Sequence, residues 1–443
     1  MNKKIRDTLF GIFVFLFVTI TIVLSLYATG YRFNFTWPLR LDLMLVKTGT
    51  LALDSKPSGA KITITSETKI SSTFPFLKSK KDQVTPIKIK NLLPGEYTVT
   101  FNLDNYWPYE KKLRVNPEQT TFLEDVILFK KSLPLNVYST KAQDISYSLN
   151  GNYIWLKNDN LIINAKTEEV AARLDNKKSH WVGNGKQVLN GSKLINLDSG
   201  NVFDYQNIIG NVDEVQMSNN NSFLVYLSNN NLAAYNNTTK TTILIPNSGS
   251  IINYELINNT VVIVALEKGK TEIKLFDLNS KTFLNSTELL SSKSFTLSQD
   301  NAKTPILIDN EHKIIYLLAT SGNDSIIKEI IRGGTIFKWL DNNKLAYTVE
   351  SEIYIYDLAQ SKSYLITRLG ERINSLVWSS NNYLIYSTEN NIGTINLAEA
   401  GNDTTMLWQG NDISSLYFDD KNGILYFSGA IGKQSGLYKM ALR

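Results

Sequence analysis

The chain has 443 residues, of which 43% are hydrophobic and 20% charged, so it holds enough apolar material for a large folded core and is not of the disordered class. Its 46 basic and 41 acidic residues leave a formal net charge of +5 spread along the chain, which argues against a nucleic-acid groove, and we expect no nucleic-acid partner. The absence of cysteine excludes disulfides, thiolate nucleophiles and cysteine-ligated metals.

An uncharged apolar run over residues 9–28 predicts a membrane-spanning helix, because about 20 residues at ~1.5 Å rise cross a ~30 Å hydrocarbon core. Three basic residues precede the run: Lys3, Lys4 and Arg6. By the positive-inside rule they predict a cytoplasmic N-terminus. We therefore expect a cytoplasmic tail (residues 1–8), a bilayer anchor (residues 9–30) and an extracytoplasmic remainder, which together make a single-pass type II protein of the cell membrane.

The residues after the apolar run bear on this interpretation. Four aromatic residues follow it, as an outer interfacial belt would: Tyr27, Tyr31, Phe33 and Trp37. Arg32 and Arg40 lie on the same side and count slightly against the orientation. The alternative is a cleaved signal peptide, whose apolar region is shorter and ends at a small-residue cleavage site. Here the run is longer and continues into Tyr-Ala-Thr-Gly, which favours an uncleaved anchor.

A small β module is predicted over residues 49–128. Apolar residues alternate with polar ones in residues 50–64, 85–89 and 93–101, and turns containing Pro and Gly separate these segments. Short alternating strands between turn signals predict a small β-sandwich.

This module resembles a PEGA domain. The resemblance depends on four motifs: Pro57-Ser58-Gly59-Ala60 with Ser in the Glu position, Thr85-Pro86, Leu93-Pro94-Gly95-Glu96-Tyr97, and Asn105-Tyr106-Trp107-Pro108. It implies a β-sandwich of the bacterial cell surface, often beside a membrane anchor, without catalytic residues. From their place on a turn, we expect Tyr106, Trp107 and Tyr109 to form a candidate exposed binding patch.

Residues 129–443 contain internal repeats. The clear copies begin at Ile145, Val215, Ile336, Leu376 and Leu416, and fainter ones at Trp181, Tyr254 and Phe295. Each copy reads as strand, Asn/Asp/Gly turn, strand, turn and strand, at a spacing of about 35–42 residues. This pattern predicts a β-propeller of seven or eight blades, with a strand at residues 135–138 closing the ring. The predicted fold class is therefore all-β: a transmembrane helix, a PEGA-like sandwich and a propeller.

One repeat contains a more specific motif. The segment Ser148-Leu149-Asn150-Gly151-Asn152-Tyr153-Ile154 resembles the Ser-Pro-Asp-Gly-x-x-Ile turn of TolB-like propellers, with Leu149 in place of Pro and Asn150 in place of Asp. The Gly-His and Trp-Asp signatures of WD repeats are missing. The motif therefore supports the architecture and does not select one propeller family.

The sequence offers little for catalysis. Neither histidine, His180 nor His312, lies in a nucleophile elbow, and we expect surface or turn positions for both. The segment 419–423 superficially resembles a calcium loop, but it is too short and reads as a hairpin turn. We predict no catalytic residue, no metal and no cofactor.

The expected function is that of a membrane-anchored extracytoplasmic scaffold, which recognises a protein or cell-wall glycan partner through its propeller without catalysis. One alternative is a surface glycan hydrolase that uses carboxylates in the propeller channel, where Asp213, Glu214 and Glu255 are the candidates. The other is a purely structural envelope spacer. Acids that converge in the channel with raised pKa values would favour the hydrolase, and a ring without a polar pocket would favour the spacer.

Overall fold

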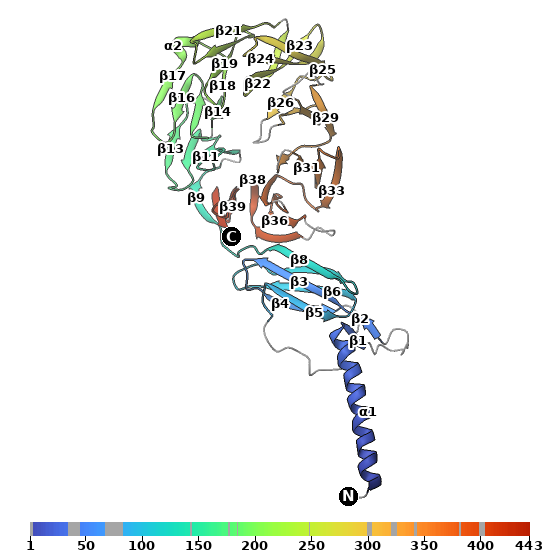
Figure 1. The fold of residues 1–443 in the computed structure, drawn as a ribbon. Coiled ribbons are helices and arrows are strands. Elements are labelled where there is room, and N and C mark those ends of the chain that lie inside the picture. The colour runs from blue at the N-terminus through green and yellow to red at the C-terminus, as the bar shows by residue number, and fades with distance from the viewer. Residues whose placement is uncertain are drawn as a thin grey trace. The chain divides into compact units, whose positions relative to one another are not determined.

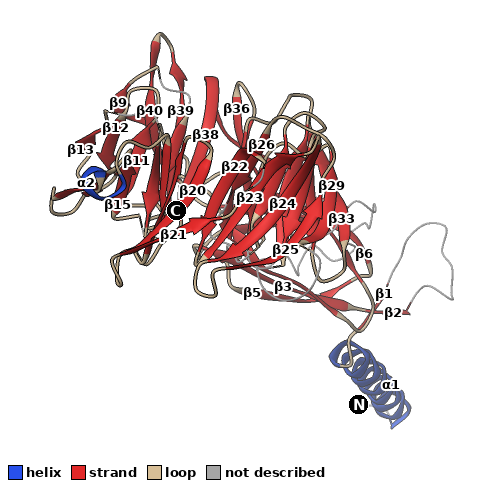
Figure 2. Cartoon of the chain, turned by 90° about the horizontal axis from the view of Figure 1, so that it is seen from above, coloured by secondary structure: helices blue, strands red, loops and turns tan. Residues whose placement is uncertain are grey.

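The computed structural model describes the chain except for residues 1–2, 34–44, 67–82, 142–143, 176–177, 184, 248, 299–303, 320–325, 341–342, 381 and 398–403. The chain divides into two compact units. The first comprises Met1–Ser132 with Leu442–Arg443, and the second comprises Leu133–Ala441. Figure 2 shows that strands make up most of the drawn structure, with helix α1 and the short helix α2 (Gln206–Ile209) as exceptions.

Helix α1 (Lys3–Ala28) is long and apolar enough to cross a membrane over Ile5–Ala28, a stretch of 24 residues. Its apolar side chains are exposed. The hydroxyls of Thr19 and Thr21 donate to the carbonyls of Phe15 and Phe17 at 2.9 and 2.8 Å. These polar groups are thus satisfied inside the helix, as a hydrocarbon environment requires.

A short hairpin follows the helix directly. Strand β1 (Tyr31–Phe33) pairs with β2 (Leu45–Lys47) in antiparallel register. The backbone N–H and the hydroxyl of Thr48 both donate to the Gly30 carbonyl at 2.8 Å, which fastens the helix end to the start of the next strand. Trp37 and Arg40 lie outside the described residues.

The small β module is a sandwich of two three-stranded sheets. One sheet has the order β5-β3-β8 and the other β4-β6-β7. Their strands are β3 (Gly49–Lys56), β4 (Lys61–Ser66), β5 (Ile87–Leu92), β6 (Gly95–Asn102), β7 (Tyr109–Val115) and β8 (Thr120–Ile127). Both sheets contribute to one core, which includes Leu51, Val99, Phe101, Leu113 and Val126. The alternation read from the sequence therefore points its apolar face inward.

A buried pair of hydroxyls joins two of the turn motifs. Ser55 and Thr85 are 2% and 3% exposed, and their hydroxyl oxygens lie 2.7 Å apart. Ser55 Oγ also donates to the Pro57 carbonyl at 2.8 Å, and the N–H of Ala60 donates to Thr85 Oγ1 at 3.0 Å. This network holds the Pro57–Ala60 turn against the start of the segment that leads into β5.

The second unit is a ring of eight four-stranded antiparallel blades among the described residues, arranged in chain order (Figure 1). Blades 1 and 2 comprise β10 (Ile145–Tyr147), β11 (Tyr153–Leu156), β12 (Leu161–Asn164) and β13 (Val170–Arg173), then β14 (Ser179–Val182), β15 (Gln187–Asn190), β16 (Lys193–Asn196) and β17 (Val202–Asp204). Blades 3 and 4 comprise β18 (Glu214–Met217), β19 (Phe223–Ser228), β20 (Asn231–Asn236) and β21 (Thr241–Ile245), then β22 (Ser250–Ile257), β23 (Thr260–Glu267), β24 (Lys270–Asp277) and β25 (Thr282–Glu288).

Blades 5 and 6 comprise β26 (Phe295–Ser298), β27 (Ile306–Asp309), β28 (Ile314–Leu318) and β29 (Ile327–Arg332), then β30 (Phe337–Trp339), β31 (Lys344–Val349), β32 (Glu352–Asp357) and β33 (Lys362–Arg368). Blade 7 comprises β34 (Ser375–Ser380), β35 (Tyr383–Ser387), β36 (Asn391–Asn396) and β37 (Thr404–Gln409). Blade 8 joins β38 (Asn411–Asp419), β39 (Ile424–Ile431) and β40 (Gln434–Ala441) with β9 (Leu135–Ser139).

Strand β9 closes the ring as the sequence predicts. It pairs with β40 antiparallel, and Tyr138 lies opposite Leu437. The eighth blade is thus built from two segments far apart in the sequence. Blades 8 and 1 then share a core that contains Ile154, Ile163, Tyr426 and Leu437, so the circle of packed blades is complete.

The repeated Ser-x-Asn motif forms the same turn in two blades. In blade 1, Ser148 Oγ donates to Asn150 Oδ1 at 2.9 Å and accepts from the N–H of Tyr153 at 2.9 Å. In blade 3, Ser218 Oγ donates to Asn220 Oδ1 at 2.8 Å and accepts from the N–H of Phe223 at 2.9 Å. The side chains substitute for backbone partners in a tight turn, which explains why the motif recurs.

Side chains of the innermost strands also connect neighbouring blades. Trp181 Nε1 donates to Ser146 Oγ at 3.0 Å between blades 2 and 1, and Asn253 Nδ2 donates to the Phe295 carbonyl at 2.8 Å between blades 4 and 5. Trp378 Nε1 donates to the Lys338 carbonyl at 3.0 Å between blades 7 and 6. These bonds fix the inner strands relative to one another in addition to the apolar packing between the sheets.

Candidate functional site

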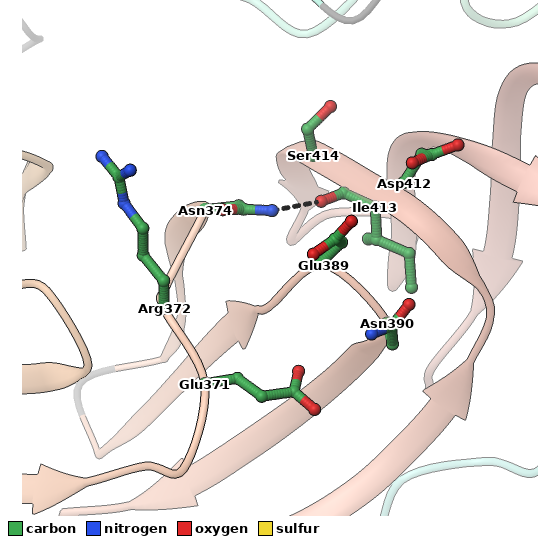
Figure 3. A pocket seen from close by; sticks show the side chains of 8 residues that line it. All are labelled: Glu371, Arg372, Asn374, Glu389, Asn390, Asp412, Ile413 and Ser414. Atoms are coloured by element: carbon green, nitrogen blue, oxygen red, sulfur yellow. Dashed lines mark hydrogen bonds between the residues drawn. The ribbon is translucent and has the colours of Figure 1, made fainter.

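A polar pocket of about 540 Å³ lies where blades 7 and 8 meet (Figure 3). Three segments form it: the loop before β34, the turn between β35 and β36, and the first residues of β38. Its lining consists of Glu371, Arg372, Asn374, Glu389, Asn390, Asp412, Ile413 and Ser414. Because these segments come from two adjacent blades, blades 7 and 8 have to be packed together before the pocket exists.

Hydrogen bonds across the blade boundary hold the pocket in shape. Asn374 Nδ2 donates to the Ile413 carbonyl at 3.1 Å, and the N–H of Ile413 donates to the Glu389 carbonyl at 2.8 Å. Asn391 Nδ2 lies 3.3 Å from both carboxylate oxygens of Glu371. Ile413 is 1% exposed and forms the buried floor. The carboxylates are therefore presented by a backbone that is already fixed, as a preformed binding site requires.

The start of β38 has an irregular backbone at the pocket. Its pairing with β39 shifts register between Asn411 and Ser414 and again between Ser414 and Tyr417. Asp412 and Ser415 adopt left-handed conformations with φ of 52° and 50°. Left-handed non-glycine residues inside a strand are strained, and bulges of this kind recur beside functional sites because they redirect side chains.

The charge of the pocket is predominantly negative. Glu371, Glu389 and Asp412 are exposed carboxylates, whereas Arg372 is the single basic residue of the lining. Figure 3 shows the Arg372 side chain extending away from Glu371 and Glu389. The lining contains one apolar side chain, Ile413, and no aromatic ring. Such a surface is complementary to a positively charged group.

A glycine beside the pocket is required for packing. Gly393 lies opposite Tyr386 in the β35–β36 pair, and a Cβ added there would lie 2.4 Å from the tyrosine hydroxyl oxygen. We therefore expect Gly393→Ala to displace the Tyr386 ring and to lower the free energy of unfolding by about 1–3 kcal/mol. Thermal unfolding of the full chain in detergent measures this effect.

Gly370→Ala is the matched control for this prediction, because Gly370 lies in the loop before β34 and an added Cβ would meet no atom within 4 Å. Equal melting temperatures for Gly393→Ala and Gly370→Ala would contradict the packing argument.

The aromatic patch predicted from the sequence is only partly present. Tyr109 is 5% exposed and packs edge-to-face on Phe101 at 5.9 Å between ring centroids, so its assignment as exposed is wrong. The physical reason is register: Tyr109 opens β7 opposite Phe101 and therefore points into the sandwich core. Tyr106 packs partly against the same core, whereas Trp107 is half-buried with Lys131 Nζ 5.1 Å from its ring centroid.

The two histidines have different surroundings. His312 lies in the turn between β27 and β28, where Nδ1 is 2.7 Å from Asp309 Oδ2, as a turn position predicts. His180 lies in β14, the innermost strand of blade 2, so its placement on a turn is wrong, and its side chain is half-buried. Burial lowers the pKa of His180 to about 4, and its Nε2 atom has no hydrogen-bond partner among the described residues. The two histidines lie in blades 2 and 5 and do not share a site.

Among the predicted channel acids, Glu255 has the most unusual environment. Burial raises the pKa of Glu255 to about 7, and the nearby carboxylate of Glu214 adds to the rise. Gln216 donates to Glu255 Oε2 at 3.3 Å and to the Tyr254 carbonyl at 2.9 Å, and it accepts from the N–H of Leu256 at 2.8 Å. The amide of Gln216 thus joins blade 3 to blade 4. Glu255 lines neither the pocket between blades 7 and 8 nor the pocket along the outer strands of blade 4.

The second pocket, of about 550 Å³, lies along the outer strands of blade 4. Its most buried cation, Lys274, contacts the carboxylates of both Glu267 and Glu272. Lys270 pairs with Glu288 at 2.8 Å. Because these charges are already paired within the blade, this pocket offers less to a ligand than the pocket between blades 7 and 8.

Asp419, in the segment that superficially resembles a calcium loop, uses its carboxylate inside a hairpin turn. Its two oxygens accept from the N–H and the side-chain amide of Asn422 at 3.2 and 2.6 Å. Among the described residues, no group of three histidine or acidic side chains is arranged to hold a metal ion.

No family model matches the sequence, and no curated protein matches it. Solved structures match at the level of the chain trace. The match to a eukaryotic initiation factor covers 68% of this chain and 88% of the other chain, with 15% sequence identity and a TM-score of 0.46. The match to dipeptidyl peptidase 4 of Porphyromonas gingivalis covers 68% of this chain and 58% of the other, with 10% identity and a TM-score of 0.47. The match to Hsv2 of Kluyveromyces lactis covers 49% of this chain and 71% of the other, with 12% identity and a TM-score of 0.34. Likeness of this degree assigns no activity to this chain.

Proposed function

We propose that this protein is a membrane-anchored, non-catalytic binding scaffold of the cell surface, with α1 as an uncleaved anchor and both β units outside the cytoplasm. In this proposal the small sandwich is a PEGA-like module next to the anchor. The propeller binds a protein partner through a basic side chain that enters the pocket between blades 7 and 8.

The observation that carries this proposal is the strained start of β38. Asp412 and Ser415 keep left-handed conformations that cost about 1 kcal/mol or more each, and the neighbouring loops hold them in place through bonds to Ile413. A spacer has no need of such a backbone. The strained segment contributes the exposed carboxylate of Asp412 to a pocket that already contains Glu371 and Glu389, and this suits recognition of a cationic group.

A protein partner is favoured over a cell-wall glycan by the composition of the lining. It holds three carboxylates and no aromatic ring on which a sugar could stack. The surroundings of Glu255 disfavour a catalytic role for its carboxylate. The Glu255 carboxylate accepts a hydrogen bond from Gln216. Its pKa is raised mainly by burial at the boundary between blades 3 and 4, and a raised pKa of this origin does not by itself indicate a substrate site.

The test is a binding measurement on the full chain in nanodiscs against lysine- and arginine-rich peptides, cell-wall glycans and a surface-protein extract, with product formation followed in the same samples. We expect saturable, salt-sensitive binding of a basic partner without turnover. The double variant Glu389→Gln/Asp412→Asn should weaken it by on the order of tenfold. The control is Asp175→Asn, an acidic residue that is 84% exposed elsewhere on the ring.

Each other outcome contradicts a specific part of the proposal. Product formation would show that the protein is an enzyme. Binding of glycans alone would replace the protein partner. Equal affinity of the double variant and the Asp175→Asn control would remove the pocket from the binding site.

A further inference from the structure

The residues that follow helix α1 include an arginine without an acidic partner. Arg32 lies in β1, four residues beyond the last residue of the helix, and is half-buried. Its Nη2 lies 3.4 Å from the Tyr27 hydroxyl, and its guanidinium carbon lies 5.5 Å from the centroid of that ring. No carboxylate among the described residues forms an ion pair with Arg32, and its buried Nε atom has no hydrogen-bond partner. The guanidinium is thus held in place with donors left over.

The neighbouring cation differs in this respect. Lys47 lies in β2 opposite Tyr31, with its Nζ atom 5.5 Å from that ring centroid. It is bonded to the carboxylate of Glu118, which raises the pKa of Lys47 through the hydrogen bond and neutralises its charge locally. Arg32 and Lys47 therefore lie on the same hairpin, but the charge of Lys47 is already paired and the charge of Arg32 is not. Only Arg32 still needs an anion.

The position of Arg32 along the chain identifies the anion. Thr29 and Gly30 bond back to Ser25 and Tyr27, so β1 begins directly at the helix end. In a chain whose helix spans the bilayer, this hairpin lies at the level of the lipid headgroups, where tyrosine rings also gather. The phosphate of a phospholipid accepts two parallel hydrogen bonds from a guanidinium, and it is the abundant anion at that depth.

We propose that Arg32, positioned by Tyr27, binds the headgroup phosphate of a phospholipid in the leaflet next to the β1–β2 hairpin. This inference rests on the proposed role of α1 as a membrane anchor. It explains why an arginine follows the C-terminal end of α1, where the positive-inside rule disfavours a basic residue.

The experiment reconstitutes the full chain in vesicles of phosphatidylcholine alone and in vesicles that also contain phosphatidylglycerol. After gentle extraction, native mass spectrometry counts the phospholipids retained by each chain. We expect Arg32→Gln to lower retention by on the order of tenfold, because a charge-assisted bidentate contact is lost. Lys47→Gln, whose charge is already paired, and Arg173→Gln, an exposed arginine on blade 1, should retain lipid like the wild type.

The outcomes separate this inference from the anchor on which it rests. Failure of the wild-type chain to enter vesicles of either composition overturns the anchor and the inference together. Insertion with equal lipid retention by the wild type and Arg32→Gln overturns the inference alone. Displacement of the retained lipid by inorganic phosphate would show a general phosphate site instead of a headgroup site.

Discussion

Replacing Tyr138 with proline is expected to open the propeller ring. Tyr138 lies in β9 opposite Leu437, in the pairing that closes blade 8. Proline there removes the backbone N–H and fixes φ at about −65°, which disfavours a regular paired strand. Blade 8 then keeps three strands, and the core shared with blade 1 loses its support. We expect the free energy of unfolding to fall by about 3 kcal/mol or more, measured by thermal unfolding of the full chain in detergent.

The same closure can be tested from the other end of the ring. A Cβ at Gly436 would lie 2.3 Å from Asn136 Nδ2 and 2.8 Å from the Tyr138 carbonyl oxygen, so Gly436→Val should separate β40 from β9. Because both changes break one contact, their combination should cost less than the sum of the two. Leu133→Pro is the control, since Leu133 is 76% exposed and precedes β9. Unchanged hydrogen exchange of residues 135–139 in Tyr138→Pro would show that β9 does not depend on this pairing.

The Glu255→Gln variant should be more stable than the wild type above pH 7 and about equally stable near pH 4. Burial raises the pKa of Glu255 in the folded protein to about 7 from an ordinary value of 4.5. A carboxyl whose folded pKa is raised binds its proton more tightly in the folded state, so its contribution to stability is complete below about pH 4.5 and declines as the pH rises to about 7. The glutamine side chain of the variant cannot ionise, so it avoids this loss, and we expect a difference on the order of 1–3 kcal/mol at pH 8.

The measurement is the difference in unfolding free energy between the two chains as a function of pH, in which other titrating groups cancel. The groups around Glu255 are the carboxylate of Glu214, which is paired with Lys178 at 3.3 Å, and the buried hydroxyl of Tyr254. Hydrogen exchange at the N–H of Leu256, which bonds to Gln216, reports whether the junction of blades 3 and 4 stays closed. A difference that does not vary between pH 4 and pH 8 would contradict the raised pKa.

Much of the fold can be predicted from the sequence because turn chemistry is local. Asn164, Asn196 and Asn236 each accept the N–H groups two and three residues ahead, so the frequent asparagines mark the turns between the third and fourth strands of blades 1, 2 and 3. The choice between seven and eight blades is harder to make at the second repeat. The strands β14, β15 and β16 have only four residues each, and His180 interrupts the apolar pattern of the inner strand.

The errors and omissions have physical reasons of their own. The sequence suggests an exposed Tyr109 because this residue follows the turn at Asn105–Pro108, whereas β7 already begins at Tyr109 and its register turns the ring inward. Sequence reasoning misses the pocket between blades 7 and 8 because Glu371, Glu389 and Asp412 come from three separate segments. The one signal that the sequence offers is that each of these three acids lies at or just before the start of a predicted strand. Their spacing along the chain does not show that the three segments meet in the folded ring.

The pairing of β9 with β40 imposes an order on biosynthesis. Ser139 emerges from the ribosome long before its partner Gly436, so the first strand of the ring has an unsatisfied edge while seven blades are still being made. A closed ring is therefore proof that the strands of blade 8 have been synthesised. A chain that ends before β40 keeps the open edge of β9, and an unpaired strand edge exposes the chain to aggregation and to recognition by chaperones and proteases.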